Sequence, residues 1–352
     1  MSITVHQRPG VYSSYDASAV VSGRGAGRLV GLAAVNTAAQ AGTVQIVTSY
    51  DQAVTLFGAG GAEDMAQLIR LALKNGASGV AAVPAASEEG YQEAFALLAG
   101  VENIAAVICG STDQAVQKLM RSSVVEASER RRERLCVAAG AADESVANLI
   151  ARAKELNHER VVLVAPGAVD EAGEPLSGLT LAAAVAGAIA GESDPAVPLG
   201  GAELSGLSGL SARLEDNDVD LLVLGGVTPL ESLGGTVSVI RGVTTRTTTG
   251  ETEDATWRDL TAIRVVDDVI PGLRSALRNK FRRAKNTEQS RGAIRAQVVL
   301  ELENKLTREI ITGYDGVKVS ADSEDPSRCL VDFSFAVAHG LNQIWITAHI
   351  TV

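Results

Sequence analysis

The stretch LCVAAGAADESVANLIARAKELNHERVVLVAP, from Leu135 to Pro166, decides the fold class of this chain. It holds two short apolar runs, 135–140 and 160–166, on either side of a helix-like segment for which Asp143 is the expected N-cap. A strand, a helix and a second strand in this order form the unit from which parallel sheets are built. The stretch therefore predicts an α/β fold with a largely parallel sheet.

The flanking sequence repeats this alternation on both sides. The run 179–191, LTLAAAVAGAIAG, is too short to cross a bilayer and is expected to form a buried helix. Aromatic residues make up only 3% of the chain, so its helices must pack through small side chains. Further strands are expected at 28–35, 43–49, 79–85, 104–110 and 219–226, and further helices at 62–77, 88–98 and 112–132.

Beyond Gly225 the pattern changes to α+β. A Thr- and Val-rich segment predicts β structure with an exposed loop at Gly250, and helices are expected at 271–285 and 290–311. Two extended runs follow, and each carries apolar residues on one face. These residues are Val331, Phe333, Phe335 and Val337 in the first run, and Ile344, Ile346, Ala348 and Ile350 in the second.

The net charge and the cysteine content restrict the class of protein. A net charge of −11 over 352 residues argues against general nucleic-acid binding, which needs a dominant basic surface. The cysteines Cys109, Cys136 and Cys329 form no CxxC pair and are expected to be buried free thiols, as in a reducing compartment. The start of the chain has no signal-peptide pattern, so a soluble cytoplasmic product is expected.

Enzyme motifs are incomplete in this sequence. Gly23, Gly25 and Gly27 precede a strand instead of a helix, and Arg28 stands where a dinucleotide fingerprint needs its third glycine. There is no Walker loop, Gly-x-Ser-x-Gly elbow or HExxH pattern. We therefore predict no catalytic, cofactor-binding or metal-binding residue. A doubly wound α/β enzyme with an unrecognised nucleotide site remains the alternative.

One charged feature stands out in this acidic chain. Residues 271–291 carry seven basic residues and a single acid, Glu288. A solvated helix face is the ordinary explanation, whereas so local a cluster also suits a partner surface of opposite charge. The cluster comprises Arg274, Arg278, Lys280, Arg282, Arg283 and Lys285.

Short motifs at both ends of the chain resemble the sheath subunits of contractile phage tails. Such proteins typically begin with Arg-Pro-Gly-Val-Tyr, as Arg8, Pro9, Gly10, Val11 and Tyr12 do here. The resemblance covers the first 60 residues and the last hundred and is thin from about 100 to 245. The other motifs that carry it are LVGLAAVN (29–36), IVTSYDQAVTLFG (46–58) and WRDLTAIRVVDDVIPGLRSAL (257–277).

The resemblance implies a structural role. Sheath subunits polymerise helically, in stacked hexameric rings, around an inner tail tube protein, together with baseplate and tail terminator proteins. Contraction then drives the tube through a target cell envelope. The expected location is the virion tail, after assembly in the bacterial cytoplasm. Neither nucleic-acid binding nor direct membrane insertion is expected. An R-type bacteriocin or another contractile injection system is the alternative machine.

Two arms are implied to link neighbouring subunits by strand addition. The N-terminal arm would act through residues 8–12, and the C-terminal arm through Ile344, Trp345, Ile346 and Ile350. The basic cluster is expected to face the tube. The resulting division is an N-terminal arm (1–24), an α/β domain (25–100), a variable α/β domain (101–245), a tube-facing α+β domain (246–338) and a C-terminal arm (339–352).

Overall fold

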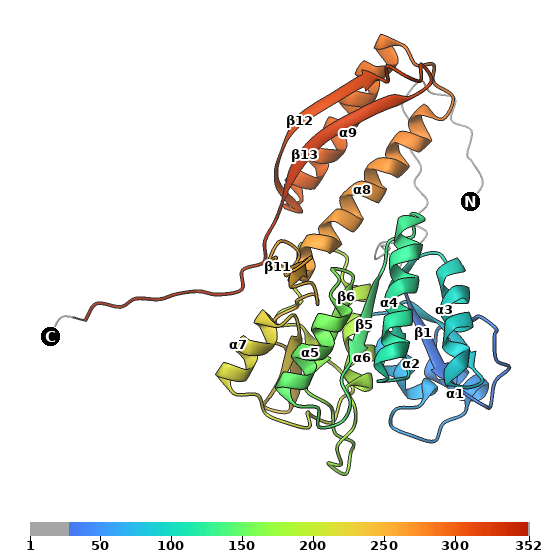
Figure 1. Cartoon of the computed structure of the whole chain (residues 1–352), viewed down its shortest axis with the longest axis vertical. Coiled ribbons are helices and arrows are strands. Elements are labelled where there is room, and N and C mark those ends of the chain that lie inside the picture. Colours follow the sequence, from blue (N-terminus) through green and yellow to red (C-terminus); the bar gives the residue numbers. More distant parts are fainter. Residues whose placement is uncertain (1–27, 351–352) are drawn as a thin grey trace, which may run out of the picture.

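The computed structural model describes residues 28–350 and divides into two parts (Figure 1). The larger part, here called the body (residues 29–259), is built on one nine-stranded sheet. The smaller part, the lobe (residues 260–337), consists of two long helices and a β-hairpin. Helix α8 (Leu260–Phe281) leads from the body into the lobe (Figure 1). The N-terminal arm lies outside the described residues.

The body sheet is largely parallel, as the sequence predicts. Its strand order is β2-β3-β1-β4-β5-β6-β8-β9-β7, in which β2 pairs antiparallel at one edge and β9 and β7 pair antiparallel at the other. The central strands are buried along their whole length because helices cover both faces. The strands are β1 (Leu29–Val35), β2 (Gln45–Val47), β3 (Gly79–Ala85), β4 (Ile104–Cys109), β5 (Leu135–Ala139), β6 (Val161–Ala165), β7 (Glu203–Leu204), β8 (Thr228–Leu233) and β9 (Thr236–Val239).

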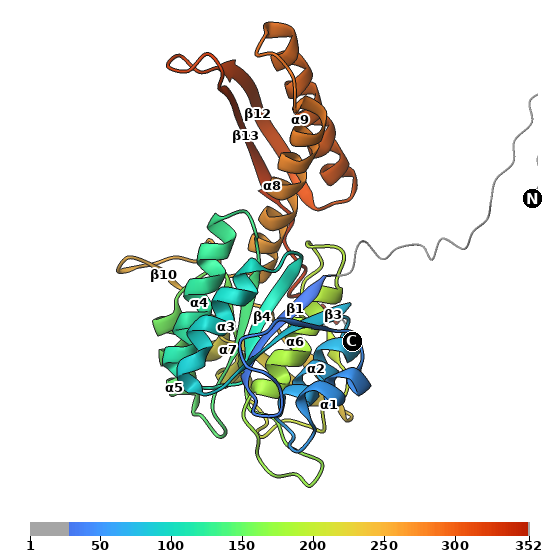
Figure 2. The ribbon, with the colours of Figure 1, turned by 90° about the vertical axis from the view of Figure 1, so that its right-hand side faces the viewer.

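Helices lie in two layers on opposite faces of this sheet (Figure 2). One layer comprises α1 (Tyr50–Phe57), α2 (Met65–Lys74) and α6 (Leu179–Gly191). The other comprises α3 (Tyr91–Gly100), preceded by a short 3₁₀ turn (Glu88–Gly90), with α4 (Gln114–Glu129), α5 (Val146–Leu156) and α7 (Asp216–Leu224).

Glycine allows α6 to pack directly against α2. A Cβ added at Gly187 would lie 2.4 Å from the backbone oxygen of Ala72, and one at Gly191 would lie 2.8 Å from the Cα of Gly76. Almost every residue of α6 is buried. The expected close packing through small side chains is thus confirmed, and the Ala-rich run is a buried helix.

Three local expectations are wrong. Residues 219–226 lie largely in helix α7, because Glu215, Asp216 and Asp218 start a helix there. Ser145, not Asp143, caps α5. Helix α9 (Glu288–Thr307) ends four residues earlier than predicted, because a strand begins at Ile311.

The expected boundary at residue 100 falls between β1 and β4. These two strands are adjacent and hydrogen-bonded in the body sheet. Residues 29–239 therefore share one sheet.

The lobe has its own core. Helices α8 and α9 pack together, and the hairpin of β12 (Ile311–Ala321) and β13 (Cys329–Val337) lies across them. Val265, Val269, Val298 and Leu302 are buried at the centre. A second, small hairpin, β10 (Thr248–Thr249) with β11 (Thr252–Glu253), projects from the body and turns at Gly250, where the sequence places a loop.

Candidate functional site

The lobe hairpin has two open edges. Within residues 28–350, β12 and β13 pair with no other strand, and they form an antiparallel pair from Ile311↔Val337 to Ala321↔Cys329. The register of β12 shifts between Asp315 and Lys318, where Gly316 has a φ of +68°. Unpaired backbone groups along such edges are a template for a strand from another chain.

The hairpin is narrower than the helical layer beneath it. Two strands spaced about 4.8 Å apart cover less width than two packed helices, each about 10 Å in diameter. Val331, Phe333, Phe335 and Val337 pack toward the helices, as their alternation predicts, yet each stays partly exposed. The helical layer therefore has room for further strands beside the hairpin.

The segment after β13, here called the C-terminal arm (339–350 as described), leaves the lobe and extends away from the molecule (Figure 1). It forms no helix or strand, and it is exposed from residue 341 to residue 350. Ile344 is 74% exposed, Trp345 89%, and Ile346 and Ile350 86% each. Large apolar side chains in this pattern leave a substantial apolar surface that no other residue of the range 28–350 covers.

The base of the arm is fixed. The Ala338 N–H donates to the carbonyl oxygen of Ile310 at 3.3 Å. A Cβ added at Gly340 would lie 2.7 Å from the Cβ of Pro198, so the arm and a body loop touch there. The direction in which the arm leaves is thus set by contacts with both the lobe and the body.

The basic cluster divides into two groups. Arg274 donates to Glu133 of the body at 2.7 Å, and Lys280 donates to Gln297 of α9 at 2.7 Å. The other four residues are exposed and make no ion pair within the described part of the chain. These four, here called the basic tip, are Arg278, Arg282, Arg283 and Lys285.

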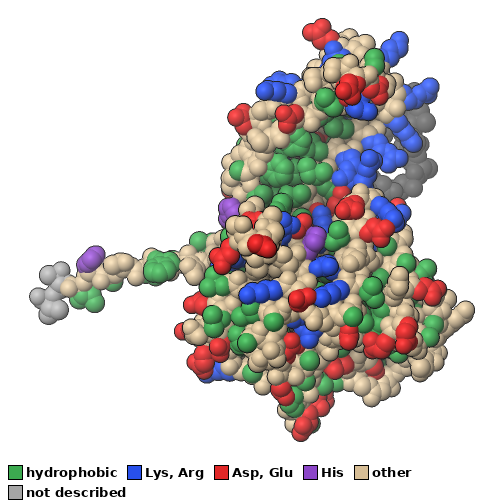
Figure 3. All heavy atoms as spheres, viewed as in Figure 1, with side chains coloured by type: hydrophobic (Ala, Val, Ile, Leu, Met, Phe, Trp, Pro, Cys, Tyr) green, Lys and Arg blue, Asp and Glu red, His purple; other side chains and the backbone are tan. Residues whose placement is uncertain are grey.

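Helix geometry accounts for part of the basic tip. Helix α8 ends at Phe281, so the last basic residues follow its C-terminus instead of lying on the expected helix. Cations there interact favourably with the helix dipole. Lys and Arg side chains gather along one side of the molecule, from the lobe to the upper body, in Figure 3.

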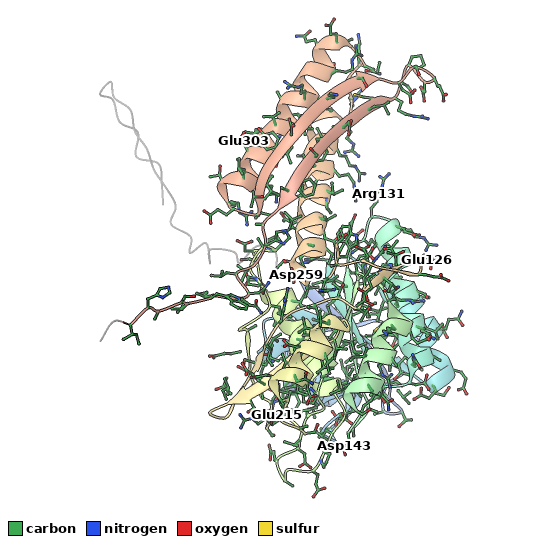
Figure 4. All side chains as sticks on the ribbon, turned by 60° about the vertical axis from the view of Figure 1, so that its left-hand side comes forward. Glu126, Arg131, Asp143, Glu215, Asp259 and Glu303 are labelled. Carbon is green, nitrogen blue, oxygen red and sulfur yellow. The ribbon has the colours of Figure 1, made fainter. Side chains whose placement is uncertain are left out.

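Buried charges join the lobe to the body. Arg160 donates to the two carboxylate oxygens of Asp267 at 2.7 and 2.9 Å, and their side chains are 13% and 8% exposed. Arg264 donates to the carbonyl oxygens of Val197 and Asp194, and burial lowers its pKa to about 10. Figure 4 shows Asp259 at this junction, immediately before α8.

A groove beside α4 and α5 lies where α/β enzymes commonly hold ligands, at the carboxyl end of a parallel strand. Its main charged groups are already paired with each other. Arg152 donates to Glu144 at 2.9 Å and to the carbonyl oxygen of Thr112 at 2.8 Å, and Lys118 pairs with Glu155.

The thiols and histidines form no reactive cluster in residues 28–350. Cys109 and Cys136 are buried as expected, and burial raises the pKa of Cys109 to about 12, whereas Cys329 is half-exposed. Among the described residues, no group of His, Cys, Asp or Glu is arranged to bind a metal ion. Over the same range, no helix has the length and apolar character needed to cross a membrane.

The sequence indicates the apolar alternation of the C-terminal arm and the six-residue basic cluster, but it did not predict three other features. Strand β12 was not predicted because Gly313 and Gly316 interrupt its alternation of apolar and polar residues. The Arg160–Asp267 pair joins residues 107 apart and has no local signal. The packing of Gly340 on Pro198 likewise depends on the tertiary fold alone.

Comparisons with known proteins give one family. Residues 85–245 match the model of the phage tail sheath protein central domain, and residues 252–351 match that of the phage tail sheath C-terminal domain. The tail sheath protein of Bacillus phage SP01 is 25% identical over 242 residues, which are 67% of this chain and 41% of that protein. The chain thus spans about two-fifths of the length of this curated relative.

Solved structures show the same fold at low sequence identity. The sheath tail protein of Desulfitobacterium hafniense superposes with a TM-score of 0.69 at 13% identity, covering 93% of this chain and 100% of that one. The helical sheath of the anti-feeding prophage in its contracted state superposes with a TM-score of 0.72 at 18% identity, covering 99% of each chain. With two domain models matched in order over most of its length, the chain belongs to the phage tail sheath protein family.

Proposed function

We propose that this chain is the structural subunit of a contractile tail sheath. Such a subunit polymerises helically around an inner tube, and the polymer contracts to drive the tube through a target cell envelope. The observation that carries the proposal is the C-terminal arm, whose exposed isoleucines have no partner in the described chain, combined with the two open edges of the lobe hairpin.

The arm and the edges are complementary in chemistry. Ile344, Ile346 and Ile350 point to one side of an extended chain, as do the half-buried residues of β13. An arm added beside a neighbour's hairpin would form hydrogen bonds with the unpaired backbone groups of the hairpin edge. The isoleucines of the arm would then be buried on that neighbour's helices. The isoleucines, not Trp345, would face the helices, because Trp345 lies on the opposite side of the strand.

Transfer of an arm from each subunit to the next is a head-to-tail contact. Such contacts generate rings or open helices, which is the geometry a sheath needs. The N-terminal arm would link subunits in the same way. In this proposal the arms comprise residues 1–24 and 339–352, and each subunit, body and lobe together, moves as one rigid unit between the extended and contracted packings.

The basic tip would face the inner tube. Four exposed cations that make no ion pair within residues 28–350 suit an acidic surface, and a shell of like-charged subunits could be templated on such a tube. Baseplate and tail terminator proteins would bind the two ends of the polymer. The same reasoning applies to a phage virion tail, an R-type bacteriocin or another contractile injection system.

A nucleotide-binding enzyme is the weaker candidate. At the carboxyl ends of β1 and β4, where such a site would lie, a Cβ added to Gly110 would lie 2.7 Å from the Cβ of Ala34. Gly110, whose N–H donates to the carbonyl oxygen of Ala33, therefore packs directly against β1 at this position. The paired charges in the groove beside α4 and α5 also favour a structural role.

Arm substitutions test the proposal with the monomer intact. Ile344→Asp combined with Ile346→Asp should abolish polymerisation, because charges cannot be buried against the neighbour's helices. The control is Thr347→Asp, on the other face of the same exposed segment, which should polymerise like the parent. Sedimentation and electron microscopy give the readout, and normal tubes from the double variant would contradict the proposal.

A further inference from the structure

Side-chain amides bind the backbone at both edges of the body sheet. At one edge, the carbonyl oxygen of Ile46 in β2 accepts from the Gln52 amide at 3.3 Å, and the N–H of Thr48 donates to the same amide at 3.1 Å. At the other edge, the Asn75 amide accepts from the N–H of Ser205, directly after β7, at 2.8 Å and donates to the carbonyl oxygen of Ser205 at 3.0 Å. Gln52 lies in α1, and Asn75 follows α2.

The Gln52 amide lies on the side of β2 that no other strand occupies. Backbone groups two residues apart, such as those of Ile46 and Thr48, point to the same side of a strand. Strand β3 pairs along one side of β2, and no second strand of residues 28–350 pairs with β2. A single amide group thus occupies both the acceptor and the donor that an added strand would use.

Without this amide, the β2 edge would attract a strand. Val44 is 37% exposed and Ile46 is 45% exposed, and β-branched side chains favour strand pairing. Sheet edges are commonly protected by charged side chains or proline, but β2, with the sequence Gln-Ile-Val, has neither. The protection of this edge therefore depends on Gln52.

The lobe hairpin lacks this kind of cover. Within residues 28–350, no asparagine or glutamine side chain bonds to the backbone of β12 or β13. The carbonyl oxygen of Val317 accepts from Arg295 at 3.0 Å, but Val317 lies inside the bulge of β12, where the register is already shifted. A strand from a second copy thus meets backbone groups held by amides at the body sheet and open backbone groups at the lobe.

We propose that Gln52 is a specificity-determining residue of assembly. Its amide closes the β2 edge, so that two copies of the chain do not pair through their body sheets and strand addition is left to the lobe. Asn75 has the same role at the β7 edge. The inference rests on the proposed sheath function and adds the means by which incorrect pairing is excluded. The association that Gln52 prevents is antiparallel pairing of β2 with β2 of a second copy, which a two-fold axis allows.

Sedimentation velocity of an arm-disabled full-length chain tests this role separately from sheath assembly. The background is the Ile344→Asp and Ile346→Asp double variant, in which pairing through the C-terminal arm is removed. Adding Gln52→Ala removes the amide from β2 and keeps a good helix former in α1. We expect a shift from monomers to dimers and larger species, whereas the background itself stays monomeric.

Two matched variants separate edge pairing from unfolding. Gln114→Ala removes a glutamine of α4 whose side chain bonds to no strand backbone within residues 28–350, and it should leave the background monomeric. Ile46→Lys combined with Gln52→Ala should restore the monomer, because a charged side chain on an edge strand opposes pairing. Association that persists in this combination, or that Gln114→Ala produces equally, would overturn the inference.

The outcomes separate this inference from the sheath function. A Gln52→Ala chain that stays monomeric in the arm-disabled background would overturn the inference while the sheath function stands. With the arms intact, Gln52→Ala should reduce the yield of regular tubes in electron micrographs in favour of irregular aggregates, and the parental yield of tubes would also overturn the inference. Failure of the unsubstituted chain to form tubes would contradict the sheath function and would leave the sedimentation result unchanged.

Discussion

The guanidinium of Arg160, beside the start of β6, contacts both carboxylate oxygens of Asp267 in α8, at 2.7 and 2.9 Å. Burial raises the pKa of Asp267, and the Arg160 charge opposes this shift. A two-point contact between body and lobe, supported by the Arg274–Glu133 pair, restricts rotation of α8. The lobe and its hairpin are thus held in one orientation relative to the body.

This pair should contribute strongly to stability. Asp267→Ala leaves the buried Arg160 charge without its partner, and breaking a buried pair in this way costs about 3–5 kcal/mol. We expect the free energy of unfolding, measured with urea, to fall by that amount. Glu155→Ala is the control, because its partner Lys118 is 41% exposed and such surface pairs contribute about 0–1 kcal/mol. Equal effects of the two substitutions would contradict a buried junction.

Two glycine substitutions should change the free energy of unfolding in opposite directions. Gly187→Ala places a methyl group 2.4 Å from the Ala72 oxygen, and overpacking of this kind destabilises by about 1–3 kcal/mol. Gly292→Ala, within α9, meets nothing within 4 Å and should stabilise by about 0.5–1 kcal/mol, because alanine favours the helix. Urea unfolding measures both. A stabilising Gly187→Ala would show that α2 and α6 are not in close contact.

The thiols should differ in reactivity. Cys109 and Cys136 are buried, and burial raises the pKa of both, so at pH 8 they are protonated and shielded. We expect one rapidly reacting thiol per native chain with Ellman's reagent, and Cys329→Ser should remove it. All three should react after denaturation. A fast thiol that persists in the Cys329→Ser variant would contradict the packing of β4 and β5.

Charge reversal at the basic tip tests the tube contact. Arg282→Glu with Arg283→Glu should weaken assembly on the tube, with a smaller effect at high salt, because exposed charges are screened. Arg213→Glu, which reverses one exposed arginine of the body, is the control for a charge reversal away from the basic tip. Co-sedimentation with tubes gives the readout. Unchanged assembly of the double variant at physiological salt would contradict a tube-facing basic tip.

The fold class was predictable because its signals are local. Buried parallel strands read as apolar runs, so 104–110, 135–140 and 160–166 were identified correctly, as was the helix 179–191. The apolar run 219–226 was wrongly predicted to be a strand because a short apolar run can form either a helix or a strand, and periodicity alone does not distinguish them.

The candidate site was only partly predictable. The isoleucine alternation of the C-terminal arm is visible in the sequence, but the open edges that suit it depend on β12, whose bulge hides its pattern. The base of the arm joins segments near 198, 310 and 340, and no local spacing relates them. Such features arise only when the body and the lobe are brought together.

The most direct test of the sheath function is negative-stain electron microscopy of the purified full-length chain without any other tail protein. We expect long hollow tubes with a regular helical surface, formed through the arms alone. The Ile344→Asp and Ile346→Asp double variant, prepared in parallel, should give only small particles. Small discrete particles from the unsubstituted chain at every concentration and salt tested would contradict arm-driven self-assembly.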